Sequence, residues 1–434
     1  MTVHEPELRL AEISSAAGDP TEASGILTID LGAVAANWKT LASMTVPVEC
    51  AAVVKGDGYG CGLEPVTRTL ARAGCSTFFV ADVGEGRRVR AIAPDAVIYV
   101  LNGVMPGSAQ AFAADSLRPV INSTTELAEW DAFVATRNWR GGAALHVDTG
   151  MNRLGITLEE AVAIAPRLQS ENHGFTLVMS HLACAEISHH PMNDRQVRLF
   201  REIRILYRGV PSSLANSSGI FLGGGAHCDL VRPGVALYGV NPTPGKRNPM
   251  RPVVELKGRI IQVRAVDKGD SVGYGAAFTA TRPSRVAIIA VGYADGFLRS
   301  ASAAKGKPAA QVIIAGKRCP IAGRVSMEVM AVDVTDLPDG TVRRGDFATL
   351  IGDGMSVDEV AAAMGTIGYE VLTHLGWRYH RAYKGGEPRQ HMRATARYLS
   401  PHVLSHPDCT DLAENRSERG PLQHLGFLSF SYAG

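Results

Sequence analysis

The sequence of 434 residues is long enough for two domains, or for one large barrel with a smaller partner domain. Its 44 basic and 42 acidic side chains almost balance, which excludes the strongly basic surface of a nucleic-acid-binding protein. No apolar run approaches the ~18 residues of a membrane helix, and the N-terminus lacks the apolar segment of a signal peptide. We therefore expect a cytoplasmic protein that binds neither nucleic acid nor membrane.

The first half of the chain, from about Ile26 to Val240, alternates short apolar runs with segments of helical period. Strands without polar alternation, each followed by an amphipathic helix, are typical of parallel strands buried on both faces. About eight such units over roughly 220 residues favour a (β/α)8 barrel over an open sheet. The apolar runs are ECAAVVK, STFFVAD, AVIYVLN, LRPVIN, ALHVDTG, FTLVMSHL, SSLANSSG and LVRPGVALYG.

The pattern changes after the loop NPTPGKRNPMRP. The apolar segments VVELKGRIIQVRAV, SRVAIIAVGY, AAQVIIAG, MAVDVTD and FATLIG have no helices between them, which predicts a mostly β domain. The last part of this domain, SVDEVAAAMG and YEVLTHLGWRYHRAY, is expected to be helical. The expected divisions are an N-terminal tail at 1–25, the barrel at 26–245, the β-rich domain at 246–385 and a C-terminal tail of uncertain order at 386–434.

Polar residues follow the ends of the predicted barrel strands, where the catalytic groups of such barrels lie. They are Lys55, Asp148, Arg153, His181, Asn216, Ser217 and Arg232. A lysine at this rim with a lowered pKa can attack a carbonyl carbon, which admits an aldolase or a pyridoxal phosphate enzyme. The glycine-rich stretches GDGYGCG, NSSGIFLGGG and RPGV could each present backbone N–H groups to a phosphate or form tight turns.

A group of metal-ligating residue types occurs in the stretch HLACAEISHHPMND. It contains Cys184, Glu186, His189 and His190. Their spacing fits no common zinc pattern. We therefore expect a solvated loop here and no metal site.

Nine motifs, in order along the chain, resemble those of alanine racemase, a pyridoxal phosphate-dependent family of fold type III. They cover roughly residues 26–385. The resemblance implies a homodimeric isomerase that interconverts L- and D-alanine, for peptidoglycan precursors or for alanine catabolism, with active sites shared between subunits. The motifs are VVKGDGYGCG, HVDTGMNRLG, SHLACAEI, LANSSG, LVRPGVALYG, VGYGAAF, VGYADGFLR, GRVSMEVMAVDVTD and TIGYEVLTHLGWRYHR.

The resemblance assigns the residues that bind the cofactor. Lys55 matches the lysine that holds pyridoxal phosphate covalently and acts as one of two catalytic bases. Arg232 matches the arginine that faces the pyridine nitrogen. A permanent cation there keeps this nitrogen unprotonated and weakens the ring as an electron sink, which favours racemisation over transamination. The residues expected around the phosphate are Tyr59, Asn216, Ser217, Gly234, Val235 and Tyr369.

Racemisation needs a second base on the opposite face of Cα. The resemblance gives this role to Tyr274 and implies that it reaches the barrel of the other subunit, where Arg153 and His181 surround it. The same analogy implies that Tyr293 narrows the entrance, and that Arg153 and the Met327 backbone hold the substrate carboxylate.

The chain departs from the family pattern at His146, where many members have a carbamylated lysine that supports the arginine equivalent to Arg153. A histidine cannot supply this anion. We expect another acid, a neutral imidazole or chloride to orient Arg153, or else a shifted substrate range. In the first motif, Gly56 and Gly58 stand where alanines are familiar, and we expect them to loosen the loop beside Lys55.

Three other functions are weighed against alanine racemisation. One is a broader amino-acid racemase of the same fold. Another is a non-catalytic pyridoxal phosphate carrier, which would lack the β-rich domain and Tyr274. The third is a fold type III decarboxylase, which would have an acid in place of Arg232 and a catalytic cysteine that we do not find.

Overall fold

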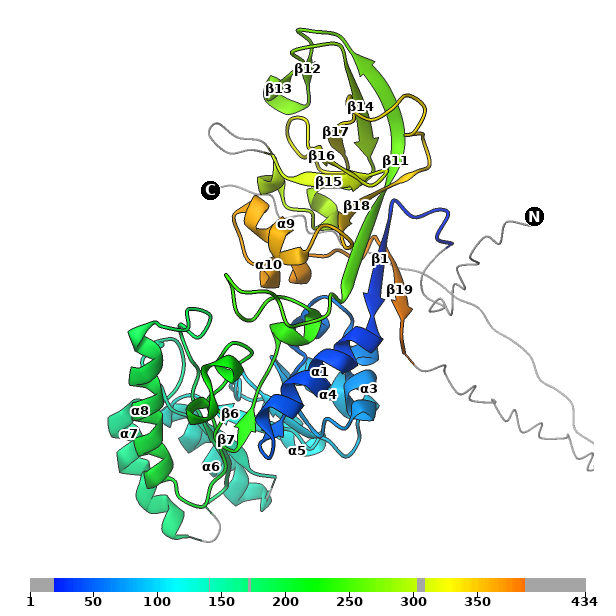
Figure 1. Ribbon diagram of the computed structural model, residues 1–434. Coiled ribbons are helices and arrows are strands. Elements are labelled where there is room, and N and C mark those ends of the chain that lie inside the picture. The colour runs from blue at the N-terminus through cyan, green and yellow to red at the C-terminus, as the bar shows by residue number, and fades with distance from the viewer. Residues whose placement is uncertain (1–18, 140, 171–172, 303–308, 387–434) are drawn as a thin grey trace, which may run out of the picture. The chain divides into compact units, whose positions relative to one another are not determined.

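A computed structural model describes residues 19–139, 141–170, 173–302 and 309–386 (Figure 1). The tail expected at 1–25 lies outside these residues up to position 18, and the tail expected at 386–434 lies outside them from position 387. In the described part of the chain, no helix has both the length and the hydropathy needed to cross a membrane.

Eight parallel strand segments of the described residues form a closed barrel. The strands β3 to β9 pair in sequence order, while β10 pairs with β2, which directly precedes β3. Backbone bonds from Asp229 N to Ser212 O and from Arg232 N to Ala215 O, both 2.9 Å, join the last two segments and complete the ring. The segments are β2 (Glu49–Cys50) with β3 (Ala52–Val53), β4 (Thr77–Val80), β5 (Val97–Val100), β6 (Arg118–Ile121), β7 (Ala143–His146), β8 (Phe175–Met179), β9 (Ser212–Ser213) and β10 (Leu230–Val231). The predicted barrel is thus confirmed.

Helices follow the barrel strands, and polar caps fix where several of them begin. The side chains of Asp82, Ser123 and Thr157 each accept a hydrogen bond from the backbone N–H three residues later, which satisfies a donor that the helix itself cannot pair. The α-helices of this half are α1 (Leu31–Thr45), α2 (Lys55–Tyr59), α3 (Leu63–Ala73), α4 (Val83–Ile92), α5 (Ala109–Ala114), α6 (Thr124–Arg137), α7 (Leu158–Ile164) and α8 (Pro191–Leu206). Its 3₁₀ helices are η1 (Ala165–Gln169), η2 (Gly219–Leu222), η3 (Gly224–Ala226) and η4 (Val235–Tyr238).

The β-rich part is organised around the long strand β11 (Val254–Val266), which pairs antiparallel with β1, β14 and β18. A separate antiparallel hairpin joins β12 to β13. The other strands are β1 (Gly25–Asp30), β12 (Ser271–Val272), β13 (Phe278–Thr279), β14 (Ser284–Ile289), β15 (Gln311–Ile314), β16 (Lys317–Pro320), β17 (Met330–Asp333), β18 (Phe347–Ile351) and β19 (His380–Lys384). The helices are η5 (Tyr274–Ala276), η6 (Tyr293–Asp295), η7 (Arg299–Ala301), α9 (Val357–Met364) and α10 (Gly368–Thr373).

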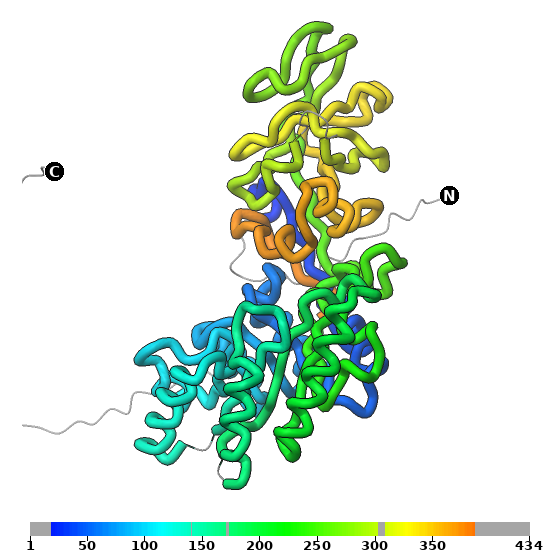
Figure 2. Tube along the Cα trace, turned by 90° about the vertical axis from the view of Figure 1, so that its left-hand side faces the viewer, coloured from blue at the N-terminus to red at the C-terminus, as the bar shows by residue number. Residues whose placement is uncertain are grey.

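Two segments lie in this sheet that the sequence pattern placed elsewhere. Residues 26–29, at the start of the range expected for the barrel, pair with β11 on one side and with β19 on the other. Figure 2 shows this N-terminal strand, in blue, beside the orange end of the described chain. The segment YEVLTHLGWRYHRAY was predicted as helix, but it is helical only to Thr373. The prediction for its second half is wrong because β19 finds hydrogen-bond partners along β1, which outweigh its local pattern.

Candidate active site

The polar residues predicted from the strand ends gather at one rim of the barrel. Lys55 lies two residues after β3, Arg153 in the loop after β7, and His181 two residues after β8. Asn216 and Ser217 follow β9, and Arg232 directly follows β10. Since all these strands are parallel, their carboxyl ends meet at the same end of the barrel. His181 Nδ1 lies 3.5 Å from Arg232 Nη2. Burial lowers the pKa of His181 well below its ordinary value, and the nearby cations Arg232, Arg153 and Lys55 lower it further.

Lys55 is the first residue of α2 and follows the buried strand β3. Although its side chain remains accessible to solvent, loss of water around the amine lowers the pKa of Lys55, and the nearby Arg153 guanidinium lowers it further. The carboxylate of Glu85 acts in the opposite direction. A larger fraction of the amine is therefore neutral near physiological pH than in a free lysine, as a base or a nucleophile requires.

Arg232 is a buried cation, with a side chain only 3% exposed. Its guanidinium donates hydrogen bonds to Ser213 Oγ and, at 2.6 Å, to the carbonyl oxygen of Ser180. No ion pair joins it to a carboxylate in the described residues, and burial lowers its pKa to about 10. A permanent cation held this way suits a ligand that offers a neutral acceptor, such as an unprotonated ring nitrogen.

A second group of residues packs closely around Gly234. Ser217 Oγ accepts hydrogen bonds from the N–H groups of Gly234, at 2.9 Å, and Ala236, at 3.2 Å. A Cβ on Gly234 would lie only 2.3 Å from Tyr59 Oη, so the tyrosine hydroxyl lies directly against this backbone. The Tyr59 ring stacks on Tyr238, with 4.6 Å between ring centroids. The Ser217 hydroxyl, whose oxygen accepts from these N–H groups, and the Tyr59 hydroxyl are suitable hydrogen-bond donors to a phosphate.

Three further residues that were predicted to bind the phosphate lie near this group. Val235 is buried and starts η4. Asn216 Oδ1 accepts a hydrogen bond from Gly219 N at 2.9 Å, which fixes the loop after β9. Tyr369, on α10 of the β-rich part, faces Tyr59 with 6.1 Å between ring centroids.

His146, at the position that departs from the family, is buried at the end of β7. Its Nδ1 lies 2.8 Å from Asn122 Oδ1, while the amide nitrogen of Asn122 donates to the carbonyl oxygens of Leu101 and Val120. Because these two bonds orient the asparagine, Nδ1 of His146 must carry the proton and Nε2 must be an acceptor. Burial and the charge of Arg232 lower the pKa of His146 to about 4. The imidazole is therefore neutral near physiological pH, and the described hydrogen bonds join it to Asn122 and not to Arg153.

Replacing His146 with glutamine is expected to weaken the acid sensitivity of folding. The ordinary histidine pKa of 6.5 applies to the unfolded chain, whereas the folded value is about 4. The unfolded state therefore binds more protons between these values, and the stabilisation present above pH 6.5 is lost as the pH falls toward 4. The wild type should lose about 2 to 3 kcal/mol through this group by pH 4.5. Urea unfolding at pH 7 and pH 4.5 measures the loss, and an equal loss in the variant would contradict the assignment.

The β-rich part carries the other predicted site residues. Tyr293 and Met327 lie on neighbouring loops, joined by hydrogen bonds from Tyr293 N to Ser326 O, 3.1 Å, and from Ala294 N to Met327 O, 3.0 Å. Tyr274 lies in the connection between β12 and β13, and its side chain is 70% exposed. Figure 1 shows this hairpin at the end of the β-rich part opposite β1 and β19, which adjoin the barrel. The described contacts join neither Tyr274 nor Tyr293 to Lys55.

Sequence reasoning missed three residues of this site: Asn122, Glu85 and Arg88. Asn122 follows β6 directly, so the rule that strand ends carry the chemistry could have found it. Glu85 and Arg88 lie on α4 and resemble ordinary surface charges in the sequence. The described residues contain no group of three or more side chains that could hold a metal ion.

Both parts of the chain match known protein families. The family described as "Alanine racemase, N-terminal domain" matches residues 29–242, and "Alanine racemase, C-terminal domain" matches residues 253–383. An alanine racemase of Methylobacterium sp. (strain 4-46) is 50% identical over 357 residues, which is 82% of this chain and 97% of the relative. The chain belongs to the alanine racemase family. The predicted family and enzyme class, a pyridoxal phosphate-dependent isomerase, are thus confirmed.

Further alanine racemases extend this likeness. One from Mesorhizobium japonicum, named catabolic, is 47% identical over 84% of this chain and 94% of its own. The solved structure of alanine racemase from Bartonella henselae, with covalently bound pyridoxal phosphate, has a TM-score of 0.79 and 38% identity. It covers 83% of this chain and 99% of its own. A non-catalytic carrier or a decarboxylase is not favoured by any of these likenesses.

Proposed function

We propose that this chain interconverts L- and D-alanine with pyridoxal phosphate, and that Lys55 and Tyr274 are its two bases. The observation that carries the proposal is that Lys55 and Arg232 lie at the same rim of the barrel. Lys55 is an amine with a lowered pKa, and Arg232 is a buried cation that pairs with no carboxylate among the described residues. The proposed catalytic unit combines a cofactor-binding barrel over residues 31–245 with a β-rich domain over 246–385 that carries Tyr274 and also contains strand β1.

The described residues fit pyridoxal phosphate. Arg232 would donate to the pyridine nitrogen, and its permanent charge would keep that nitrogen unprotonated. Lys55 would hold the cofactor covalently. When bound, pyridoxal phosphate acidifies the Cα–H bond of an amino acid attached to it. The residues that would hold its phosphate are Tyr59, Asn216, Ser217, Gly234, Val235 and Tyr369, and His181 would contact the cofactor beside Arg232.

Two proton-transfer groups on opposite faces of Cα account for inversion. Lys55 Nζ would take the proton from one face as a neutral amine, which its lowered pKa supports. Tyr274 Oη would transfer the proton on the opposite face. Its phenolate would be stabilised in a cationic environment, which Arg153 and the other rim cations provide.

The exposure of Tyr274 supports a homodimer with shared sites. A general acid–base residue must lie within hydrogen-bond reach of the reacting proton, and within one chain the exposed Tyr274 has no described contact with Lys55. Tyr293 and Met327 are also exposed. We propose that the partner's barrel covers this surface. Tyr274 and Tyr293 would then border the entrance, while the Met327 backbone and Arg153 would hold the substrate carboxylate.

Circular dichroism of L-alanine solutions tests the proposal. With added pyridoxal phosphate at pH 8, the wild type is expected to reduce the alanine signal to zero, while Lys55→Ala should leave it unchanged. A panel of other L-amino acids measures substrate breadth. Faster decay with another amino acid than with alanine would favour the broader racemase. A stable alanine signal with a cofactor-loaded wild type would contradict the proposed activity.

A further inference from the structure

The backbone after Lys55 forms an unusual left-handed turn. Gly56, Asp57, Gly58 and Tyr59 have φ values of 65°, 54°, 62° and 53° in succession. Such a conformation costs a residue with a side chain roughly 1–2 kcal/mol, and it is rarely sustained over several residues. The two glycines reduce this cost, but Asp57 and Tyr59 do not avoid it. The turn therefore needs support from outside.

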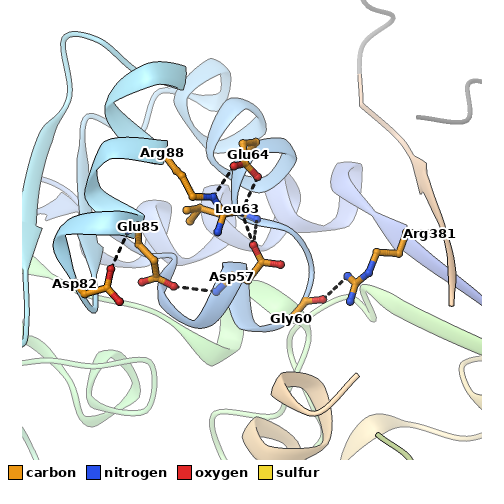
Figure 3. A network of polar contacts seen from close by, with 8 residues as sticks. All are labelled: Asp57, Gly60, Leu63, Glu64, Asp82, Glu85, Arg88 and Arg381. Atoms are coloured by element: carbon orange, nitrogen blue, oxygen red, sulfur yellow. Dashed lines mark hydrogen bonds and ion pairs between the residues drawn. The ribbon is translucent and has the colours of Figure 1, made fainter. Parts of the chain in front are cut away.

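This support comes from Glu85 and Arg88 of α4, which both contact Asp57 in the turn (Figure 3). Asp57 N donates to Glu85 Oε1 at 3.0 Å, and Asp57 Oδ1 accepts from Leu63 N at 3.1 Å and from Arg88 Nη2 at 2.7 Å. Arg88 is itself oriented by two hydrogen bonds to Glu64, of 2.6 and 2.8 Å. The turn is thus fixed at its second residue on both the backbone and the side chain, in contrast to the looseness expected from its glycines.

Glu85 also connects the turn to the next barrel strand. Its Oε2 accepts from Ala81 N, the residue after β4, at 2.9 Å. One carboxylate therefore bridges the ends of two adjacent strands, with Lys55 at one of them. The same carboxylate raises the pKa of Lys55 and so opposes the effects of burial and Arg153.

We propose that Asp57, Glu85 and Arg88 form a positioning network, which holds the left-handed turn and thereby fixes the backbone of Lys55. Within this network Glu85 also moderates the protonation of Lys55. None of the three is among the residues proposed to contact substrate or cofactor, so they act on the reaction only by positioning Lys55. The inference rests on the proposed role of Lys55 as a base.

Labelling of the Lys55 amine tests the electrostatic part without relying on activity. Full-length protein, freed of cofactor with hydroxylamine, is acylated with acetic anhydride at a series of pH values, and Lys55 labelling is measured by peptide mass spectrometry. The charged or titratable groups that face this amine are Arg153 from the loop after β7, His181 after β8 and Glu85 from α4. Glu85→Gln should shift the labelling profile about half a pH unit or more toward acid, because the amine loses its nearby anion. An unshifted profile would overturn this role.

Kinetics of the cofactor-loaded enzyme test the geometric part. Arg88→Gln should reduce kcat at least tenfold with a smaller change in KM, since a displaced base impairs the chemical step more than binding. Glu85→Asp keeps the charge but shortens the reach, so it should reduce kcat while leaving the labelling profile near that of the wild type. Thermal unfolding of each variant verifies that the fold is retained.

Arg87→Gln is the matched control. Arg87 neighbours Arg88 on α4, but its exposed side chain pairs with the half-buried Asp115, at 2.7 Å, and not with the turn. Its variant should stay within about twofold of the wild type, as expected for a surface pair. Equal losses in the Arg87 and Arg88 variants would overturn the proposal. If the wild type itself fails to racemise alanine while the labelling shift occurs, the proposed function fails and the network stands.

Discussion

A heterodimer of two inactive variants, Lys55→Ala and Tyr274→Phe, is expected to show about half of the wild-type racemase activity. Each variant alone should lose activity at least about 100-fold, because each lacks one of the two proposed proton-transfer groups. In a dimer with shared sites, the Tyr274→Phe chain contributes an intact Lys55 and its partner contributes an intact Tyr274. One of the two sites is then complete.

The experiment uses co-expressed chains with two different affinity tags, purified in succession so that only the mixed pair remains. The control pairs Lys55→Ala with the double variant Lys55→Ala/Tyr274→Phe, which contains no complete site in any arrangement. A purified heterodimer without activity would show that Tyr274 does not act across the interface. Failure of the two tags to purify together would argue against the dimer itself.

Much of the fold follows from hydrophobic patterning. The barrel strands are buried on both faces, and their uninterrupted apolar runs, such as TFFV in β4, predict this burial. The pattern could not place β1 and β19, because both owe their position to pairing across most of the chain length. The two strands pair with each other although they are more than 350 residues apart, so no local hydrophobic pattern could indicate the contact.

The candidate site was predictable to the extent that its residues stand at strand ends. Lys55 and Arg232 are ionisable residues at the ends of apolar runs that predict buried strands. An ionisable side chain at a buried position is unusual, and it can be recognised in the sequence. The proton position on His146 depends on Asn122, 24 residues away, and burial decides that the ring is neutral and not protonated at physiological pH. The left-handed turn was visible as a run of glycines, but the charges on α4 that hold it were not, since only tertiary structure brings them there.

Gly234→Ala is expected to weaken pyridoxal phosphate binding at least about tenfold, because the new methyl group would clash with the Tyr59 hydroxyl. The added Cβ would lie 2.3 Å from Tyr59 Oη and 3.0 Å from its Cζ, both well inside van der Waals contact. Tyr59 is buried and stacked on Tyr238, so it has little room to withdraw. Equilibrium dialysis with pyridoxal phosphate measures the loss. Gly224→Ala is the control, since nothing lies within 4 Å of its Cβ position.

The double variant Gly234→Ala/Tyr59→Phe separates this steric effect from a general loss of stability. Tyr59→Phe removes the phenolic oxygen and with it the closest overlap, and it also removes the proposed hydrogen bond from Tyr59 to the phosphate. If the hydroxyl is the group that Gly234 accommodates, the two losses should not add, and the double variant should bind the cofactor about as well as Tyr59→Phe alone. Additive losses would mean that the methyl group disturbs the Ser217 and Ala236 contacts instead. Glycine is required at this position, on our interpretation, because the backbone must approach a tyrosine hydroxyl more closely than any side chain permits.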